Sequence, residues 1–386
     1  MLPCSPVSGL QKAGKGWKEM VEPYYQDEAI TIFHGNSLDV LKELPSESVH
    51  CCVTSPPYWG LRDYGCNGQL GLEKTPAEYI ANMVEIFRMV RELLTDDGTL
   101  WLNIGDSYAS GKGTCFNPGG GCSSIGKDRK EAGAHPLDRG NKSDLEAVGL
   151  KPKDLVGIPW MVAFALRADG WYLRQDIIWS KPNPMPESVT DRCTKSHEYI
   201  FLLSKSPRYY YDQEAIKEPI KDTSVARLIQ DVESQAGSER VPGKTNGNMK
   251  AVKFGGNKQC PDTRLQSGKE WHPLCAGGSP ASQGHSGYFN VDGTARGGIM
   301  ANKKSVWTVT TKGYKEAHFA TFPPELIIPC IKAGCPEGGI VLDPFFGSGT
   351  TGEVCRKLSR KCIGIELNEA YIEDLAIKRF AQGVLL

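Results

Sequence analysis

Apolar runs and amphipathic segments alternate along most of this chain. Runs rich in β-branched residues predict strands, and the segments between them, with apolar residues at helical spacing, predict helices. The strands are expected at 29–35, 49–55, 99–107, 172–182, 338–343 and 361–367, with a closing hairpin at 197–206 and 208–212. The helices are expected at 37–45, 75–94, 154–170, 323–335, 351–359 and 368–380. Strands that alternate with helices predict an α/β fold with a largely parallel sheet.

Two stretches interrupt this order, at residues 107–150 and 217–317. Both are rich in Gly, Ser and Lys and show little periodicity. The second holds 15 Lys and Arg against 9 Asp and Glu, a difference of 15 − 9 = +6, in a chain of formal net charge +0. A basic, glycine-rich stretch of this kind is either a nucleic-acid-binding surface or an ordinary solvated insertion.

The composition is that of a globular protein, with 40% hydrophobic and 23% charged residues. No apolar run approaches the roughly 18 residues of a membrane span, and the N-terminus lacks the apolar core of a signal peptide, so we expect a cytoplasmic protein. The 13 cysteines include no CxxC pair, which favours free thiols in a reducing cell. A zinc site is the less favoured alternative, because the spacing of its possible ligands matches no usual pattern; these are Cys260, His272, Cys275 and His285.

The segment "IVLDPFFGSGTTGEV" (340–354) has the form of a ligand-binding turn between a strand and a helix. Its strand ends at Asp343, and Gly347 and Gly349 permit a tight turn with close backbone approach. Glu366 ends the next strand, 366 − 343 = 23 residues later, where an acid usually binds ribose hydroxyls. The dinucleotide and P-loop fingerprints are both absent. S-adenosylmethionine, with ribose hydroxyls, no phosphate and a cationic amino group, therefore fits better than a nucleotide, and a glycine turn without ligand is the alternative.

A second motif, "TSPPYWG" (54–60), follows the strand at 49–55. Together, "TSPPY" and "DPFFGSGTT" (343–351) resemble the catalytic and cofactor motifs of amino-methylating DNA methyltransferases, which use S-adenosylmethionine. The order of the motifs is similar to that of the circularly permuted β group. The resemblance implies a Rossmann-like, seven-stranded α/β methyltransferase sheet with an inserted target recognition domain. We therefore expect a flexible arm at 1–28, a catalytic half at 29–212 with an insertion at 107–150, the recognition domain at 213–317 and a cofactor half at 318–386.

The resemblance also implies site residues. The catalytic ones are Ser55, Pro56, Pro57 and Tyr58. The cofactor-binding ones are Asn36, Phe319, Thr321, Asp343, Phe345, Gly347, Ser348, Gly349, Thr350 and Glu366. Asn36 stands where the family has an aspartate, and Phe319 and Thr321 lie in "HFATFP", which resembles the segment before the cofactor strand. Candidate contacts to DNA are Trp59, Lys181, Arg240, Lys244, Lys250, Lys253, Lys303 and Lys304. The expected partner is double-stranded DNA, and the sequence leaves open whether a cognate restriction endonuclease exists.

The diproline corner suits the chemistry of an exocyclic base amine, whose lone pair is delocalised into the ring. The Ser55 hydroxyl oxygen and the Pro56 carbonyl can accept the two N–H hydrogens, and the prolines fix both acceptors in advance. The base must first leave the duplex, and Tyr58 can then stack on it. In the family, SPPY is associated mainly with cytosine N4, and DPPY or NPPY mainly with adenine N6. Cytosine C5 methylation needs a thiolate, and none lies in the corner.

Several alternatives stay open on the sequence. Adenine N6 could replace cytosine N4 as the target within the same group. An RNA or a free base could replace DNA, although the basic insertion argues against a free base. A non-catalytic nucleic-acid-binding protein with a decayed methyltransferase core belongs to a different class, and the intact motifs argue against it. For the corner taken alone, a proline turn that closes a strand on core aromatics is also possible.

Overall fold

The computed structural model describes residues 22–61, 64–109, 148–219, 300–311 and 322–382. The chain separates into two units, one formed by Met1–Ile216 with Lys304–Leu386 and the other by Lys217–Lys303. In the second unit the described residues include an antiparallel strand pair, β7 (Glu218–Pro219) with β8 (Met300–Ala301). Most of the predicted recognition domain lies outside the described residues, so its role stays a prediction.

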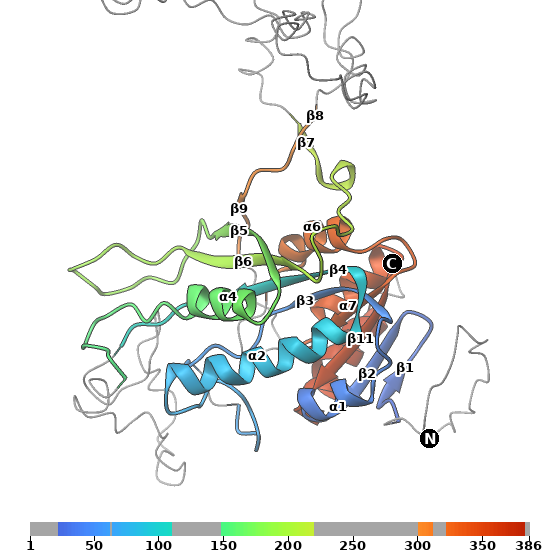
Figure 1. Cartoon of the computed structure of the whole chain (residues 1–386), viewed down its shortest axis with the longest axis horizontal. Helices are drawn as coiled ribbons and strands as arrows, with labels where there is room; N and C mark the ends of the chain where they lie inside the picture. The colour runs from blue at the N-terminus through green and yellow to red at the C-terminus, as the bar shows by residue number, and fades with distance from the viewer. Residues whose placement is uncertain (1–21, 62–63, 110–147, 220–299, 312–321, 383–386) are drawn as a thin grey trace, which may run out of the picture. The chain divides into compact units, whose positions relative to one another are not determined.

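The first unit is built on a nine-stranded sheet in the order β1-β2-β11-β10-β3-β4-β6-β5-β9 (Figure 1). Its long strands are β2, β3, β4, β5, β6, β10 and β11, at Ile30–His34, Val49–Thr54, Leu94–Ile104, Tyr172–Ser180, His197–Ser204, Ile340–Asp343 and Lys361–Glu366. Two short edge strands, β1 (Tyr25–Gln26) and β9 (Val306–Thr308), complete it. Among the long strands described, β6 alone runs antiparallel to its neighbours. The predicted seven-stranded α/β sheet is thus confirmed, with one short strand added at each edge.

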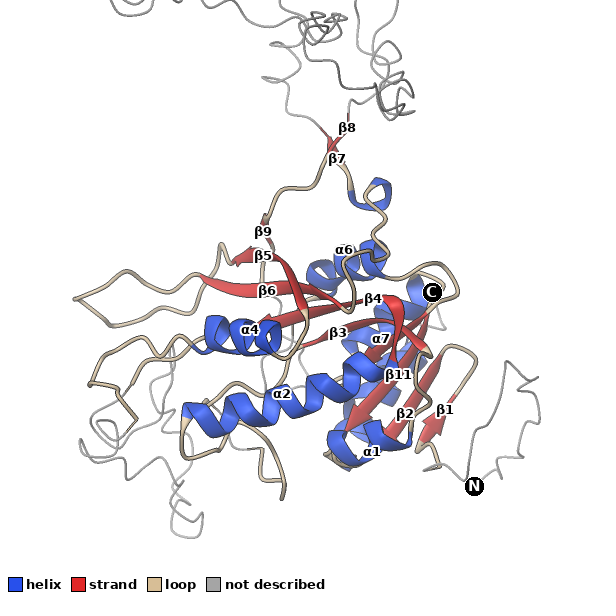
Figure 2. Ribbon diagram, viewed as in Figure 1, coloured by secondary structure: helices blue, strands red, loops and turns tan. Residues whose placement is uncertain are grey.

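Helices cover both faces of this sheet (Figure 2). On one face lie α1, α2 and α4, at Ser37–Glu43, Pro76–Leu93 and Ile158–Ala168. On the other lie α6 and α7, at Pro324–Gly334 and Thr350–Lys357, with the C-terminal α8 (Glu369–Tyr371), π-helix η6 (Ile372–Ile377) and α9 (Lys378–Gln382). A 3₁₀ turn, η2 (Glu214–Ile216), packs near α6. Two apolar layers therefore sandwich the sheet, as parallel sheets require.

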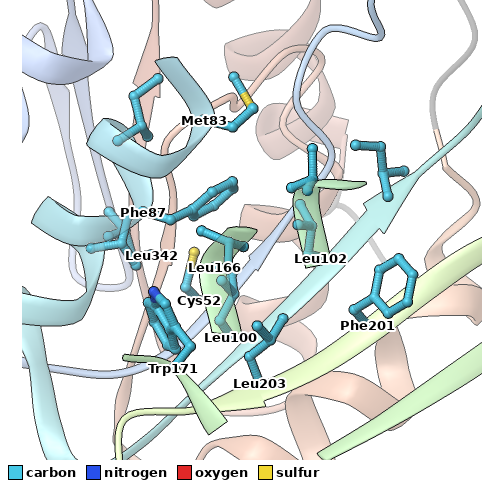
Figure 3. Packing of buried hydrophobic residues seen from close by; sticks show 14 of the residues in the cluster. Cys52, Met83, Phe87, Leu100, Leu102, Leu166, Trp171, Phe201, Leu203 and Leu342 are labelled. Carbon is cyan, nitrogen blue, oxygen red and sulfur yellow. The ribbon is translucent and has the colours of Figure 1, made fainter. Parts of the chain in front are cut away.

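The layer under α2 shows how the sequence pattern becomes packing. The helix begins as its capping box predicts: Thr75 accepts from the Glu78 amide, and Pro76 occupies the first turn. Its apolar stripe places Met83 and Phe87 against the sheet residues Cys52, Leu100, Leu102 and Leu342 (Figure 3). All of these side chains are buried. Burial of each large side chain contributes roughly 1.5–3 kcal/mol, so this layer holds the carboxyl ends of β3, β4 and β10 in place.

The winding of the chain reverses between β10 and β3. From β10 the chain passes through α7 to β11 on one side, and from β3 it passes through α2 to β4 on the other. The two helices cover opposite faces of the sheet. Such a switch point opens a crevice beyond the carboxyl ends of the two strands, where α/β proteins bind their ligands. The two sequence motifs follow β3 and β10 and therefore both enter this crevice.

Two predictions of the chain's organisation are wrong. Residues 208–212 form no strand, because β6 already pairs with β4 and β5 and offers no free edge. They cross the strand ends instead, with the Tyr210 amide on the Asp97 carbonyl and the Asp212 amide on the Ala333 carbonyl. The flexible arm predicted at 1–28 is wrong for its last residues, since β1 pairs with β2 and Asp27 closes the turn between them, whereas residues 1–21 lie outside the described residues.

No described helix is long and apolar enough to cross a membrane. The described cysteines are free, and most of them are buried. In the described ranges no group of three or more His, Cys, Asp or Glu is placed to hold a metal ion. The four residues of the alternative zinc site, at 260–285, lie outside those ranges.

Candidate active site

Hydrogen bonds join the two sequence motifs at the switch point. The Thr54 hydroxyl, at the end of β3, donates to Oδ1 of Asp343 over 2.6 Å. The Thr351 hydroxyl, in the first turn of α7, donates to Oδ2 over 2.6 Å, and the Phe345 amide donates to Oδ1 over 3.1 Å. Asp343 is 1% exposed. Its carboxylate therefore ties the corner that begins at Ser55 to the glycine turn, and direct contact between Asp343 and the cofactor stays a prediction.

The glycine turn after β10 forms an open cradle. Gly347 and Gly349 have φ values of +52° and +76°, a region that L side chains rarely adopt. A Cβ at Gly347 would meet no atom closer than the Phe345 carbonyl oxygen at 3.9 Å, so this side of the turn faces open space. At Gly349 a Cβ would lie 2.9 Å from Phe380 and 3.0 Å from Ala376. One glycine thus borders a free space, and the other lets the C-terminal helix pack against the loop.

Glu366 supports the same turn from the next strand. Its Oε2 accepts from the Gly347 amide over 2.7 Å, and its Oε1 accepts from the Asn368 amide over 2.8 Å. Burial raises the pKa of this carboxyl, against the lowering effect of the two amides. Asn36 lies at the end of the neighbouring strand, where it caps α1 by accepting from the Leu38 amide. Ser37 donates to the Pro344 carbonyl over 2.6 Å, so the start of α1 also borders the cradle.

A hydrogen bond from α2 braces the diproline corner. The Tyr79 hydroxyl, on the buried side of α2, donates to the Pro57 carbonyl over 2.9 Å. Among the residues that the structure describes, no donor occupies the Pro56 carbonyl. The Ser55 hydroxyl donates to the Tyr58 hydroxyl over 3.4 Å. The two oxygens expected to receive an amine, on Ser55 and Pro56, are thus presented on a braced backbone.

Tyr58 fits into a gap that only glycine leaves. A Cβ at Gly105, just after β4, would lie 2.6 Å from Cε2 of the Tyr58 ring. The Tyr58 hydroxyl donates to Oε2 of Glu198 over 2.7 Å and lies 3.2 Å from Oδ1 of Asn103. Burial, and next to it the charge of Glu198, raise the pKa of Tyr58 well above its ordinary value. The phenol is therefore protonated and uncharged.

Glu198 contacts groups from the ends of three other strands, β3, β4 and β5. It lies at the start of β6, whose direction brings that end to the carboxyl edge of the sheet. Its Oε1 forms an ion pair with Lys181, which follows β5 and also lies 4.3 Å from the centre of the Trp179 ring. Asn103 on β4 donates to Oε2 over 3.4 Å. This arrangement places a carboxylate two hydroxyl groups away from the expected position of the target amine.

The chain also matches a known protein family. Residues 49–378 match the family model described as DNA methylase, which covers N6 and N4 methyltransferases. The chain belongs to this family. The methyltransferase M.Cfr9I of Citrobacter freundii is 42% identical over 90% of this chain and 87% of its own length. M.SmaI of Serratia marcescens is 43% identical over 88% and 87% of the two chains. Both carry the name Type II methyltransferase, and the predicted roles in DNA methylation and restriction–modification are confirmed at the level of the family.

A solved structure shares the fold. The PvuII DNA methyltransferase, titled cytosine-N4-specific, has a TM-score of 0.54 to this chain, with 16% identity over 93% of this chain and 88% of its own. The methyltransferase fold and the amino-methylating family predicted from the motifs are therefore confirmed. The cofactor of the family is S-adenosylmethionine, as predicted.

The residues of the methyltransferase fit this cofactor. The space beside Gly347 lies next to the half-buried carboxylate of Glu366, whose oxygens keep lone pairs for ribose hydroxyls. Phe345 and Ser348 belong to the same turn, and Thr350 begins α7 directly after it. Ser348 and Thr350 are buried, and their hydroxyl oxygens lie 3.5 Å apart. The other two predicted cofactor residues, Phe319 and Thr321, lie outside the described residues.

The structure changes the interpretation of several candidate DNA contacts. Trp59 is 3% exposed and packs in the core, where its indole donates to the Glu73 carbonyl over 2.9 Å, so its predicted contact with DNA is not supported. Lys181 belongs to the polar cluster around Glu198 rather than to an open surface. In the second unit, Lys303 lies 3.9 Å from Glu218. Lys304 is described, but contact with DNA stays a prediction for both lysines, as it does for Arg240, Lys244, Lys250 and Lys253, which lie outside the described residues.

The contacts that connect the motifs could not be found from the sequence. Thr54, Thr351 and Asp343 all stand inside the quoted motifs, but the hydrogen bonds from both threonines to Asp343 appear only in the fold. In the sequence, Tyr79 is typical of the buried face of a helix and Gly105 of the end of a strand, so neither pointed to the site. Asn183, two residues after Lys181, exchanges hydrogen bonds with the Thr311 backbone.

Asp343 predicts a pH dependence of folding. Burial raises the pKa of Asp343 to about 6, above the ordinary 3.8. A carboxyl whose pKa is higher in the folded protein than in the unfolded chain stabilises the fold at pH values below its unfolded pKa. This contribution is lost as the pH rises from about 4 to about 6. This rise in the pKa of Asp343, from 3.8 to about 6, corresponds to at most about 3 kcal/mol of folding free energy. We expect Asp343→Asn to remove this part of the pH dependence, as measured by urea unfolding between pH 4.5 and 7.5 without cofactor. Parallel curves for the two proteins would contradict it.

Proposed function

We propose that this methyltransferase transfers a methyl group to the exocyclic N4 amine of a cytosine flipped out of double-stranded DNA. The observation that carries the proposal is the serine at the first position of the diproline corner, beside the cofactor cradle. In the family, SPPY is associated mainly with cytosine N4. The shared fold of the PvuII enzyme, which is titled cytosine-N4-specific, is compatible with this choice.

The corner supplies what the amine needs. The Ser55 oxygen and the Pro56 carbonyl accept the two amine hydrogens, so that the nitrogen lone pair leaves conjugation and points toward the cradle. The bond from Tyr79 to Pro57 fixes the backbone before the base arrives, which reduces reorganisation during the reaction. The cofactor, held beside Gly347 and Glu366, supplies an electrophilic methyl group.

Methylation at the ring carbon C5 has no support in the described residues. It requires a cysteine thiolate as nucleophile. Cys51 and Cys52 both lie inside β3 and are fully buried. Burial raises the pKa of both thiols well above the ordinary value, so neither supplies a thiolate at the corner.

The remaining parts of the proposal concern the DNA and its context. Residues 213–317 form the target recognition domain, a role supported by the excess of six positive charges at 217–317. The enzyme acts inside a prokaryotic or phage-infected cell, where its DNA substrate is. A cognate restriction endonuclease would cut the same sequence, in keeping with the Type II names of the relatives.

A labelling experiment tests the base and the substrate together. The protein is incubated with S-adenosylmethionine carrying a tritiated methyl group and with mixed-sequence DNA, and the DNA is then digested to nucleosides. We expect the label in N4-methylcytosine. Label in N6-methyladenine would overturn the choice of base, and label in RNA but not in DNA in a parallel incubation would overturn the choice of nucleic acid.

A further inference from the structure

Two hydroxyl oxygens and one carboxylate oxygen form a chain from the expected amine position to an acidic side chain. The Ser55 hydroxyl donates to the Tyr58 hydroxyl over 3.4 Å, and the Tyr58 hydroxyl donates to Oε2 of Glu198 over 2.7 Å. We propose that Glu198 is the acceptor of the proton that the base amine releases, and that Ser55 and Tyr58 relay this proton to it. The inference rests on the amino-methylation of the proposed function and holds for either base amine.

The reaction leaves one proton to be removed. Methyl transfer forms a nitrogen–carbon bond and breaks the carbon–sulfur bond of the cofactor, which leaves as a neutral thioether. The methylated nitrogen then carries a positive charge until one of its hydrogens departs as a proton. Ser55 receives this proton while it passes its own to Tyr58, and Tyr58 passes its own to Glu198. The product is a base with a neutral, methylated exocyclic amine. Both hydroxyl groups are restored, and Glu198 ends as a carboxylic acid.

Other groups near Tyr58 do not serve as the final acceptor. Oδ1 of Asn103 lies 3.2 Å from the Tyr58 hydroxyl, but a carboxamide takes up a proton only under strongly acidic conditions. The pKa of Tyr58, raised by burial, means that the phenol passes a proton on rather than holding a negative charge. Of these neighbours, Glu198 alone carries a carboxylate, a group that commonly serves as a general base.

The surroundings of Glu198 fix which oxygen faces the relay. Lys181 pairs with Oε1 and leaves Oε2 for Tyr58 and Asn103. The other charged or titratable neighbours are His197 and Lys195, and burial lowers the pKa of both. The side chains of Lys181 and Glu198 are 18% and 17% exposed, so the pair is shielded but retains a path to water. Lys181 is therefore a positioning residue for the carboxylate.

The test compares Glu198→Gln, Tyr58→Phe and the double variant with the wild type. Each variant keeps the size of the side chain and interrupts the relay at a different point. The rate of a single turnover on DNA is measured at pH 7.5, together with the affinity for S-adenosylmethionine by calorimetry. We expect each single variant to lose about 100-fold in rate at pH 7.5, as is usual for removal of a general base, with cofactor affinity unchanged.

Two further readouts separate a relay from a structural effect. The double variant should be no slower than either single variant, because residues that act as one unit are not additive. Glu198→Asp, which keeps a carboxylate, should recover part of the rate that Glu198→Gln loses. A matched control, Asp169→Asn, breaks the Arg88–Asp169 ion pair at the opposite edge of the sheet, where Asp169 is 14% exposed, and should leave both the rate and the cofactor affinity unchanged.

The inference is overturned by any of three results: a Glu198→Gln rate within about threefold of the wild type, a Glu198→Asp rate no higher than that of Glu198→Gln, or losses that multiply in the double variant. Failure of the proposed function is seen separately, in the nucleoside formed by the wild type. An enzyme that forms N6-methyladenine would refute the choice of cytosine, whereas the rate ratios would still decide the relay.

Discussion

Replacing Ser55 by alanine is expected to lower the rate of methyl transfer about 100-fold, because the amine loses an acceptor that acts mainly in the transition state. The hydroxyl is also the first member of the chain to Glu198, so its loss interrupts removal of the proton. The cradle at Gly347 and Glu366 is untouched by this change. Affinity for S-adenosylmethionine should therefore stay within about twofold of the wild type, as measured by calorimetry.

The matched control for this variant is Ser48→Ala. Ser48 is half-buried at the opposite end of the same strand, and its hydroxyl donates to the Pro45 carbonyl over 2.6 Å. The change removes the same group from the same element at the far edge of the sheet. It should leave the rate of methyl transfer unaffected. If Ser55→Ala and Ser48→Ala both transferred methyl groups at the wild-type rate, the assignment of the clamp would be wrong.

The second large effect is expected at the cradle, where Gly347→Ala should weaken cofactor binding at least about tenfold, or about 1.4 kcal/mol. The new Cβ would project into open space beside Glu366, which is where we expect the cofactor to lie. The positive φ of +52° adds roughly 1–2 kcal/mol of backbone strain, which lowers folding stability only moderately. Calorimetric titration with S-adenosylmethionine measures the first effect, and urea unfolding measures the second.

Substitutions at two other glycines distinguish the effect of backbone strain from the effect of filling the space expected for the cofactor. Gly338, at the opposite end of β10, has a φ of +73° and nothing within 4 Å of an added Cβ, so Gly338→Ala should cost similar stability but no cofactor affinity. Gly349→Ala would press on Phe380 and Ala376 and should mainly destabilise the fold. Equal cofactor affinities for the Gly347→Ala and Gly338→Ala proteins would refute the placement of the cradle.

The secondary structure and both motifs could be predicted from the sequence because their signals are local. Helix α2 has its capping box and apolar stripe within 20 residues, and the glycine turn is a single continuous motif. The false strand at 208–212 shows the limit of such signals. Its aromatic run has strand propensity, but β6 has no free edge for it, and pairing is decided by the whole sheet.

The connections within the site could not be predicted in the same way. Thr54 and Asp343 are 289 residues apart in sequence, and Tyr58 and Glu198 are 140 apart. Neither contact leaves a trace in local spacing. Trp59 shows the same limit. Its place next to Tyr58 in the sequence suggested a contact with DNA, whereas in the fold its side chain is buried in the core. Only the order of the strands shows that the two motifs share one crevice.

The central claim is that the diproline corner and the glycine turn act on one amine in one site. A crystal structure of the protein with S-adenosylmethionine tests this most directly. The account predicts that the sulfonium methyl faces the Ser55 hydroxyl oxygen from roughly 6 Å, the sum of a hydrogen bond of about 3 Å and a reacting distance of about 3–3.5 Å. A cofactor bound away from Gly347, or a methyl group that points away from Ser55, would contradict it.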